Sequence, residues 1–489
     1  MFPLRHCSRF AAPLIVGAIL SATSFGQVKQ TDVPRGDSPQ PVDRPDIDGL
    51  QAARALESSL VHSIAKAEAS VVAIARGRNG VKRELRDPGF VPFEYSTGVV
   101  VDARGLILTN YHSLGDVEKN DYVVWMAGKP FMNVTVKAAD PWSDLAILAI
   151  DARDLTPIEF GDGSELKKGR IVISLGNPHA IARDGNVSAA WGIVSNVSRK
   201  IDGPLQGVTG PDTVHPSNRE TRYHFGGLVQ TDLRLARGTS GGPLLDLDGR
   251  MVALSTNIAM LAGFEKGTGY AIPVDAYFQR VLEKLKRGEP VEQGFLGVAP
   301  RNPFIEDGEI GVVLADVKQG TPAAQAGMYS YDEILQIDEQ PVHNVDELFL
   351  KIGSLPPDHV AKFTIRRSSR ELTIPVRLSK KPSNASRPAI VTADGRNWRG
   401  LVVDFATALS TLRISSLDPD GCVIAAQVEQ DSPAWRSGLR VGAIINRVNG
   451  KSVRSPDEFH AAVTGEDGSP VAGDVGIGIY QQRVVVVSE

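Results

Sequence analysis

The chain has 489 residues, of which 42% are hydrophobic and 22% are charged, and its formal net charge is -4. This length is enough for about three domains of ordinary size, each with its own hydrophobic core. The mixed, slightly acidic composition excludes the basic surface of a typical nucleic-acid-binding protein. The 9 histidines are dispersed, and His215 and His224, which flank a loop, have no neighbouring cysteines or paired acidic residues, so the sequence predicts neither a metal site nor a cofactor.

The first 26 residues predict a secretory signal peptide. Basic residues precede an apolar segment from Ala11 to Leu20, and small residues follow it. The alternative is an uncleaved membrane anchor, although the apolar segment is shorter than the about 20 residues that a membrane span needs. Cleavage removes Cys7 and leaves Cys422, which by itself cannot form an intrachain disulfide. We therefore expect an extracytoplasmic protein that is stabilised by burial of its core.

Residues 27–50 are rich in Asp, Pro, Gln and Ser and contain few apolar residues, which predicts an exposed tether. In the next segment, Gln51 to Glu68, the apolar residues recur with helical spacing, at Ala52, Leu56, Leu60, Ile64 and Ala67. This spacing predicts an amphipathic helix. Its apolar face packs either on the domain that follows or on a neighbouring subunit.

Between Ser70 and Ile272 the pattern changes to short β-branched and aliphatic runs, separated by Gly, Pro, Asn and Asp. The predicted strands are residues 71–74, 98–101, 106–108, 122–125, 145–150, 171–173, 192–194 and 251–254. Many short strands with turn signals between them predict antiparallel β-barrels. The strand pattern alone also allows a β-sandwich.

Three polar residues stand at the boundaries of these apolar runs, in the order His112, Asp144 and Ser240. Each alone is equally typical of an ordinary turn, but together they predict an acyl-transfer site. Ser240 lies in the glycine-rich segment 238–243, and such a turn can direct a hydroxyl and backbone N–H groups toward one point. The His112 imidazole can accept the Ser240 proton, and Asp144 can orient the imidazole.

Tyr277 to Lys286 predicts a linking helix that ends at Gly288. After this helix the sequence repeats itself. The first copy contains residues 321–327, 332–337 and 345–348, and the second contains residues 432–438, 442–445 and 455–459. Residues 381–397, between the copies, are rich in Ser, Pro, Asn and Arg and predict a flexible linker.

The motifs 109–112, 143–148, 176–178, 238–243 and 269–273 resemble those of the trypsin-like serine proteases. Within that class they resemble the HtrA (Deg) family of periplasmic proteases, and each repeat resembles a PDZ domain of the α+β type. The resemblance implies a mainly β fold, with His112 and Asp144 on a first barrel and Ser240 on a second. The implied domains are a signal peptide 1–26, an N-terminal segment 27–50, a trypsin-like protease domain 51–287, PDZ domain 1 at 290–380, a linker 381–397 and PDZ domain 2 at 398–489.

The resemblance also implies further residues of the active site. The backbone N–H groups of Gly238 and Ser240 would form the oxyanion hole, in which Thr239 departs from the usual Asn of the family. Ile258 would line the first specificity pocket, and no acidic residue stands nearby, which predicts cleavage after small or medium aliphatic residues. The alternative for Ile258 is an ordinary core residue.

A PDZ domain adds an extended peptide to its sheet and binds the terminal carboxylate through backbone N–H groups of a glycine-containing loop. The corresponding loop of the first copy contains Gly294, Phe295, Leu296 and Gly297. The second copy has residues 399–403 at this place, which match less well. For that copy, peptide binding and a role as a spacer or assembly surface both remain open.

Three further features depart from the general pattern. Each repeat changes the Gly-Asp turn of PDZ domains, with Tyr331 in place of Gly in the first copy and Ala443 in place of Asp in the second. Residues 203–227 are polar and rich in glycine. They form either a mobile regulatory loop, as the resemblance implies, or a simple surface insertion.

The resemblance implies an ATP-independent serine endopeptidase that cleaves unfolded or misfolded proteins outside the cytoplasm. Its PDZ domains would recruit peptide C-termini, and the chain would form homo-oligomers based on trimers. We expect no nucleic-acid partner, and contact with a membrane only through an uncleaved signal segment. The alternative is a proteolytically silent peptide-binding scaffold or chaperone, but the complete set of His112, Asp144 and Ser240 favours the enzyme.

Overall fold

The structure is a computed structural model that describes residues 49–80, 94–177, 185–201, 221–258, 268–301, 311–382, 388–393, 396–408, 418, 421–465, 469, 471–480 and 484–488. The predicted signal peptide and nearly all of the predicted tether lie outside the described residues. The same holds for Pro178 and for residues 203–220 of the predicted loop. The chain divides into a unit of residues 1–52 and a unit of residues 53–489, and the fold below is that of the second unit.

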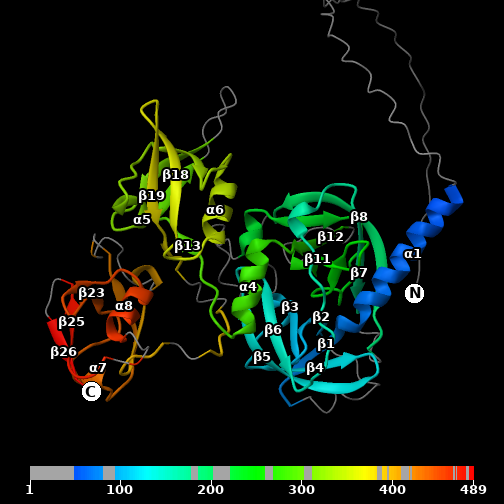
Figure 1. The fold of residues 1–489 in the computed structure, drawn as a ribbon, viewed down its shortest axis with the longest axis horizontal. Helices are drawn as coiled ribbons and strands as arrows, with labels where there is room; N and C mark the ends of the chain where they lie inside the picture. Colours follow the sequence, from blue (N-terminus) through cyan, green and yellow to red (C-terminus); the bar gives the residue numbers. More distant parts are fainter. Residues whose placement is uncertain are drawn as a thin grey trace, which may run out of the picture. The chain divides into compact units, whose positions relative to one another are not determined.

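Two closed antiparallel barrels of six strands each follow the N-terminal helix (Figure 1), which confirms the predicted barrels. The first has the strand order β1-β2-β3-β6-β5-β4, and the second has the order β10-β11-β12-β9-β8-β7. The first barrel consists of β1 (Val71–Arg78), β2 (Glu94–Asp102), β3 (Leu106–Asn110), β4 (Asn120–Met126), β5 (Lys129–Asp140) and β6 (Leu145–Ile150). The second consists of β7 (Ile171–Gly176), β8 (Ser188–Arg199), β9 (Leu228–Thr231), β10 (Pro243–Leu245), β11 (Met251–Thr256) and β12 (Gly269–Pro273).

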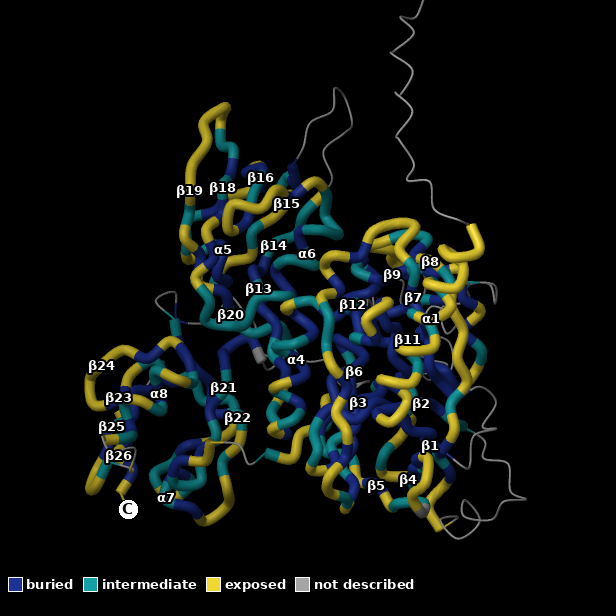
Figure 2. Tube along the Cα trace, turned by 45° about the vertical axis from the view of Figure 1, so that its right-hand side comes forward, coloured by how far each residue is buried: buried dark blue, intermediate teal, exposed yellow. Residues whose placement is uncertain are grey.

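The barrel strands that lie at the boundary of the two barrels are buried on both faces. This explains why their sequences are continuous apolar runs rather than alternating apolar and polar residues. In β1, Val72 and Ile74 fill the first barrel, whereas Val71 joins a core cluster that contains residues of both barrels. In β11, Ala253 lies in the core of the second barrel and Leu254 in the shared cluster. Figure 2 shows these buried stretches along the strands of both barrels. The shared cluster holds the two barrels together, so that the turns at their boundary have fixed positions.

Two helices flank the barrels, and both confirm predicted helices. Helix α1 (Gly49–Ala67) contacts the second barrel, where the Ser63 hydroxyl donates to the carbonyl of Leu247 at 2.5 Å. Helix α4 (Ala276–Lys286) begins at Asp275, whose side chain accepts the N–H of Phe278. Short 3-10 helices lie at η1 (Glu68–Ser70), η2 (Tyr111–Ser113), η3 (Gly163–Glu165) and η5 (Arg222–His224).

The two repeats have the same sheet topology, which confirms that they are copies of one domain. The sheet orders are β14-β15-β16-β18-β19 in the first copy and β21-β22-β23-β25-β26 in the second, so β14 and β21 are edge strands. The first copy consists of β13 (Gly294–Phe295), β14 (Val298–Arg301), β15 (Val312–Val317), α5 (Pro322–Gln325), β16 (Glu333–Ile337), β17 (Gln340–Pro341), α6 (Val345–Ser354), β18 (Val360–Arg367), β19 (Arg370–Arg377) and β20 (Ser379–Lys380). The second consists of β21 (Leu401–Phe405), η6 (Ala406–Ala408), β22 (Val423–Val428), α7 (Pro433–Arg436), β23 (Ile444–Val448), β24 (Lys451–Ser452), α8 (Pro456–Val463), β25 (Val475–Ile479) and β26 (Val484–Val487).

Part of the segment between the repeats pairs with the first barrel. Ile390 and Ala139 of β5 exchange two backbone hydrogen bonds, of 2.8 and 2.9 Å, and the Thr392 hydroxyl donates to the carbonyl of Lys137. These contacts attach residues 388–393 to β5. None of the helices in the described ranges is both long and apolar enough to cross a membrane.

Candidate active site

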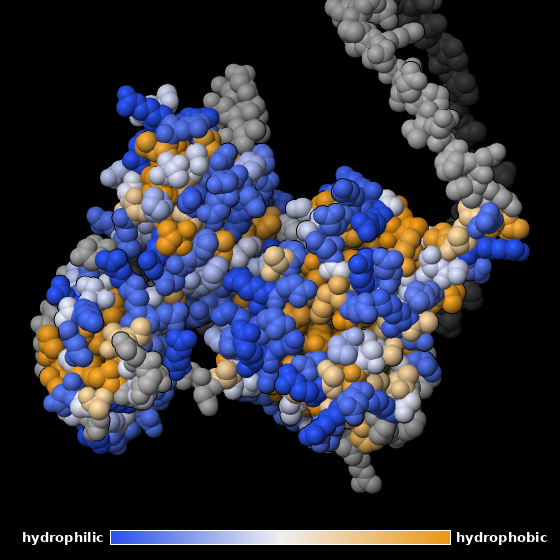
Figure 3. Space-filling view, in the orientation of Figure 1, coloured by the Kyte–Doolittle hydropathy of each residue, from blue (hydrophilic) through white to orange (hydrophobic). Residues whose placement is uncertain are grey.

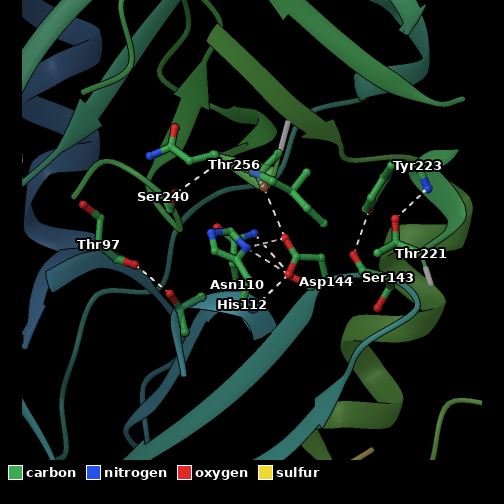
Figure 4. A network of polar contacts seen from close by, with 12 residues as sticks. Thr97, Asn110, His112, Ser143, Asp144, Thr221, Tyr223, Ser240 and Thr256 are labelled. Atoms are coloured by element: carbon green, nitrogen blue, oxygen red, sulfur yellow. Dashed lines mark hydrogen bonds and ion pairs between the residues drawn. The ribbon is translucent and has the colours of Figure 1, made fainter. Parts of the chain in front are cut away.

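His112 and Asp144 lie side by side at one end of the first barrel (Figure 4). His112 is in η2, directly after β3, and Asp144 is in the turn between β5 and β6. The imidazole Nδ1 lies 2.8 Å from Asp144 Oδ2, and the backbone N–H of His112 donates to Asp144 Oδ1 at 2.9 Å. This pairing fixes the ring and places the proton on Nδ1, which leaves Nε2 free to accept a proton from a nucleophile.

Asp144 is fully buried and is also held from the second barrel. The hydroxyl of Thr256, at the end of β11, donates to Asp144 Oδ2 at 3.1 Å. The side chain of Asn110 donates to the Asp144 carbonyl at 3.3 Å. Sequence reasoning missed Thr256, because a threonine at the end of a buried strand has no distinctive pattern.

The turn before Asp144 is a buried polar network. The Asp140 carboxylate accepts the backbone N–H and the hydroxyl of Ser143, and the Tyr223 hydroxyl donates to the Ser143 carbonyl. Burial raises the pKa of Asp140 above its usual value, although the hydrogen bonds from Ser143 oppose this shift. Asp144 itself has φ 57°, a left-handed conformation that Asp tolerates better than most residues. The network therefore fixes a locally unfavourable backbone turn.

Ser240 lies in the turn that precedes β10, and the glycines around it are required by close contacts. A Cβ on Gly238 (φ 99°) would lie 2.3 Å from the Asn177 carbonyl oxygen, and one on Gly241 (φ 85°) would lie 2.1 Å from the Thr97 carbonyl oxygen. These contacts pack the serine turn against β2 and against the end of β7. They explain why the sequence has glycines on both sides of Ser240.

The Ser240 hydroxyl accepts a hydrogen bond from the backbone N–H of Asn257 at 3.1 Å. Within the described ranges it makes no hydrogen bond with His112, although Figure 4 places Asp144 and Ser240 on opposite sides of the imidazole. In this conformation the residue after β11 holds the serine hydroxyl. Catalytic hydrogen bonds are often long without substrate and tighten when it binds, so this arrangement is compatible with proton transfer from Ser240 to His112.

The backbone N–H groups of Gly238 and Ser240 have no hydrogen-bond acceptor among the described residues. Their neighbour Thr239 is tied back by two bonds to the Ala236 carbonyl, at 3.2 Å from its N–H and 2.7 Å from its hydroxyl. Two free N–H groups beside a serine hydroxyl can stabilise an oxyanion. Thr239 keeps the turn closed by its own hydroxyl.

Ile258 follows Asn257 and is fully buried in the cluster between the barrels. Its backbone N–H donates to the Thr256 hydroxyl at 3.2 Å. In this conformation Ile258 is packed as a core residue, and residues 259–267 lie outside the described ranges. Its role in the specificity pocket stays a prediction.

In the first repeat, Leu296 and Gly297 precede β14 and have bound carbonyl groups and free N–H groups, whereas the N–H of Gly294 donates to the Leu355 carbonyl at 2.8 Å. The carbonyls of Leu296 and Gly297 accept the N–H groups of Ala323 and Lys318, at 3.0 and 3.2 Å. The N–H groups of Leu296 and Gly297 have no acceptor in the described part of the chain. Such a loop beside an edge strand can bind a carboxylate.

The corresponding loop of the second repeat is bound to itself. The N–H of Gly400 donates to the side chain of Asn397, and the N–H of Leu401 donates to the Trp398 carbonyl, both at 2.8 Å. These two N–H groups are therefore occupied. The weaker match of this loop in the sequence thus corresponds to a different hydrogen-bond pattern.

The comparisons with known proteins agree with this architecture. The profile of the trypsin-like peptidase domain matches residues 96–254, and PDZ-domain profiles match residues 278–378 and 424–472. A probable periplasmic serine endoprotease, DegP-like, from Pseudomonas fulva is 29% identical over 396 residues, which cover 79% of this chain and 75% of that protein. Its counterpart from Brucella suis is 28% identical over 402 residues, which cover 80% of this chain and 72% of that protein.

Solved structures show the same fold. The HtrA-type protease AlgW with a tripeptide has a TM-score of 0.51 and 20% identity, and the match covers 66% of this chain and 98% of that chain. AlgW with a decapeptide gives a TM-score of 0.50 and 21% identity, with 66% and 99% covered.

The fold and the domain matches define a serine protease of the trypsin-like class that carries two PDZ domains. The relatives to which the chain is similar are named DegP-like periplasmic serine endoproteases, and the solved structures that share its fold are HtrA-type proteases. Among the described residues no group of three His, Cys, Asp or Glu side chains could hold a metal ion.

Proposed function

We propose that the protein is an ATP-independent endopeptidase that cleaves unfolded or misfolded proteins outside the cytoplasm. In this proposal Ser240 is the nucleophile, His112 is the general base and Asp144 orients His112. The observation that carries it is the pair of His112 and the buried Asp144, with Nδ1 2.8 Å from the carboxylate, next to a serine turn with two free N–H groups. A peptide-binding scaffold would need neither feature. The location is supported by relatives that are named periplasmic.

The chemistry follows from the positions of these groups. His112 Nε2 takes the Ser240 proton as the hydroxyl attacks the scissile carbonyl, and the imidazolium then donates this proton to the leaving amine. The N–H groups of Gly238 and Ser240 stabilise the oxyanion, and Asp144 stabilises the imidazolium. A loss of one such N–H donor typically lowers kcat by about 10²–10³-fold.

Degradation of casein, an unfolded protein, tests this proposal. We expect wild-type protein to degrade casein and Ser240→Ala to lose at least about 10⁴-fold in kcat, as in other triad enzymes. The exposed Ser58→Ala is the matched control and keeps wild-type activity. Equal activity of wild type and Ser240→Ala would indicate a contaminating protease, and inactivity of wild type would favour the scaffold.

We also propose that the first PDZ domain recruits substrate C-termini. The free N–H groups of Leu296 and Gly297 and the open edge of β14 support this role. The self-bound loop at Gly400 and Leu401 supports a structural role for the second PDZ domain.

The proposal includes assembly of the chain into homo-oligomers. Apolar side chains gather on the protease surface over β8 (Figure 3), where Trp191 is 54% exposed, and Ile193 and Val197 are also exposed. Exposed apolar patches of this kind are typical of protein interfaces. Sedimentation of wild type should give a mass above that of one chain, and Trp191→Lys should lower it. A monomeric wild type would contradict assembly.

A further inference from the structure

Thr97, in β2 of the first barrel, contacts both residues that supply the oxyanion N–H groups. Its hydroxyl donates to the Gly238 carbonyl at 2.7 Å, and its backbone N–H donates to the Ser240 carbonyl at 2.8 Å. Thr97 is fully buried, and it lies on a different barrel from the serine turn. A single residue of the first barrel therefore holds both sides of the nucleophile turn.

The direction of the Thr97 hydroxyl proton is determined by its neighbours. The hydroxyl oxygen accepts the backbone N–H of Asn177 at 2.8 Å, so the proton is free to point to the Gly238 carbonyl. The Thr97 carbonyl in turn accepts the Thr109 hydroxyl at 2.8 Å. The polar groups of Thr97 are thus all bound, and its position is fixed by β3, by the end of β7 and by the serine turn.

These bonds limit how the oxyanion groups can turn. Gly238 has φ 99°, and a glycine can rotate into several backbone conformations unless its carbonyl is anchored. The two carbonyls that Thr97 binds belong to the peptide groups 238–239 and 240–241. The peptide group that carries the Ser240 N–H lies between these two anchored groups, and the one that carries the Gly238 N–H directly precedes the first of them. The bonds to Thr97 therefore limit how the two unbound N–H groups can turn before substrate arrives, which contributes to the preorganisation that oxyanion stabilisation needs.

We propose that Thr97 is a positioning residue for catalysis. Its hydroxyl holds the N–H groups of Gly238 and Ser240 toward the oxyanion. This proposal rests on the proposed function, because it needs Ser240 as the nucleophile. In this proposal the Thr97 hydroxyl, on the first barrel, orients the N–H groups of Gly238 and Ser240 on the second barrel. A merely structural role would instead satisfy the buried Gly238 carbonyl without effect on the transition state.

The test compares Thr97→Val, which keeps the shape but removes the hydroxyl, with Thr97→Ser, which keeps the hydroxyl. We expect Thr97→Val to lower kcat for casein about 10- to 100-fold, less than or similar to loss of a whole oxyanion donor. KM should change less than about twofold, because the oxyanion forms only in the transition state. Thr97→Ser should restore kcat to within about threefold of wild type.

A second readout uses diisopropyl fluorophosphate, whose phosphoryl oxygen occupies the oxyanion hole in the covalent adduct. The rate of inactivation of the full chain by this reagent should fall in parallel with kcat in Thr97→Val. Ser63→Ala is the matched control, because it removes another buried hydroxyl that donates to a backbone carbonyl, far from the serine turn. It should lose similar stability but keep kcat and the inactivation rate.

Wild-type kcat in Thr97→Val, or equally low kcat in Thr97→Ser, would overturn the proposal. So would a loss of kcat in Ser63→Ala as large as that in Thr97→Val. If Thr97→Val does not fold, Thr97→Cys replaces it, since a thiol is a weak donor, and a folded Cys variant with wild-type kcat also overturns the proposal. If Ser240→Ala is active, the proposed function itself fails. If Ser240→Ala is inactive and Thr97→Val is fully active, only the role of Thr97 is rejected.

Discussion

Ser240, His112 and Asp144 differ in how tightly the fold holds them. Asp144 accepts bonds from His112 and Thr256 and is fully buried, whereas the Ser240 hydroxyl has one bond, from the Asn257 N–H. The proposed acid and base are thus held in one arrangement, and the proposed nucleophile has to exchange its partner. Substrate that pairs with the backbone after β11 would compete for the Asn257 N–H and release the hydroxyl to His112.

The sequence alone indicates His112, Asp144 and Ser240 as candidates, because each lies in a local motif. Thr97 and Thr256 could not be predicted, because their contacts form only when the two barrels pack together, and the contact of Asn257 with Ser240 forms only when β10 and β11 pair within the second barrel. Thr97 lies 143 positions before Ser240 in the chain, and nothing in its neighbourhood indicates the bond to Gly238. Residues that hold a site by long-range hydrogen bonds have no sequence pattern of their own.

Cys422 gives a pH-dependent prediction at a single residue. Burial raises the pKa of its thiol to about 11. Because the folded pKa lies above the unfolded value of 9.0, the thiol contributes stability that is fully present below about pH 9 and lost as pH rises through 11. In a Cys7→Ser chain at pH 8, iodoacetamide should modify folded protein at least about 100-fold more slowly than urea-unfolded protein.

The stability of Cys422→Ala serves as the control for this pH dependence. Between pH 8 and 10 its unfolding midpoint should fall less steeply than that of wild type. Rapid alkylation of the folded chain at pH 8 would contradict the raised pKa.

At the scale of elements, the strands with continuous apolar runs were predicted correctly, whereas β5, β9, β10 and β12 were missed. Strand β5 (Lys129–Asp140) begins with Lys-Pro and mixes polar and apolar residues, so its sequence is typical of a loop. Strand β10 has only three residues. Both are strands because neighbours in a closed barrel supply their hydrogen bonds, which is tertiary context that a local pattern lacks.

Tyr331 provides a prediction for the turn before β16. This exposed residue has φ 74°, and its place in the first repeat is one where the family has glycine. A left-handed conformation costs a bulky residue about 1–2 kcal/mol, and glycine removes this cost. The more flexible unfolded state of the glycine variant takes back about 0.5–1 kcal/mol of the stability that is gained. Tyr331→Gly should therefore stabilise the first PDZ domain by about 0.5–1 kcal/mol.

Hydrogen exchange of the β15 and β16 amides measures this domain separately from the rest of the chain. Tyr331→Ala is the matched control, because it removes the ring but keeps the Cβ and the strain. Faster exchange in Tyr331→Gly than in wild type would show that the Tyr331 ring itself stabilises the turn.

At the scale of the whole molecule, the proposed catalytic groups and the proposed peptide-binding loop lie on different domains of one chain. The order of domains could be predicted from the sequence, because the repeat at residues 321–348 and 432–459 is visible in the residues themselves. The difference between the two PDZ loops could be predicted only in part. The self-bound N–H groups of Gly400 and Leu401 depend on a side-chain contact of Asn397 and on loop geometry.

Recruitment by the first PDZ domain should raise the local concentration of substrate at the protease site and so lower KM without changing kcat. Gly297→Ala tests this link, because Gly297 has φ 85° and an added Cβ would lie 2.2 Å from the Thr321 Cβ. The loop must move, which displaces the N–H groups that would bind a carboxylate. Loss of charge-assisted hydrogen bonds of about 1.5–3 kcal/mol corresponds to about 10- to 100-fold weaker binding of a peptide with a free C-terminus.

Gly327→Ala is the control for this variant, because Gly327 lies in the same domain with φ 78° but has open space around its missing Cβ. It introduces similar backbone strain without a clash at the loop. Titration of the full chain with a free-carboxylate decapeptide and with its C-terminal amide separates the two effects. Gly297→Ala should lose the preference for the free carboxylate, and its KM for casein should rise at constant kcat, whereas Gly327→Ala should keep both. If Gly297→Ala still prefers the free carboxylate, the peptide end binds elsewhere, since no other group of this loop can replace the displaced N–H donors.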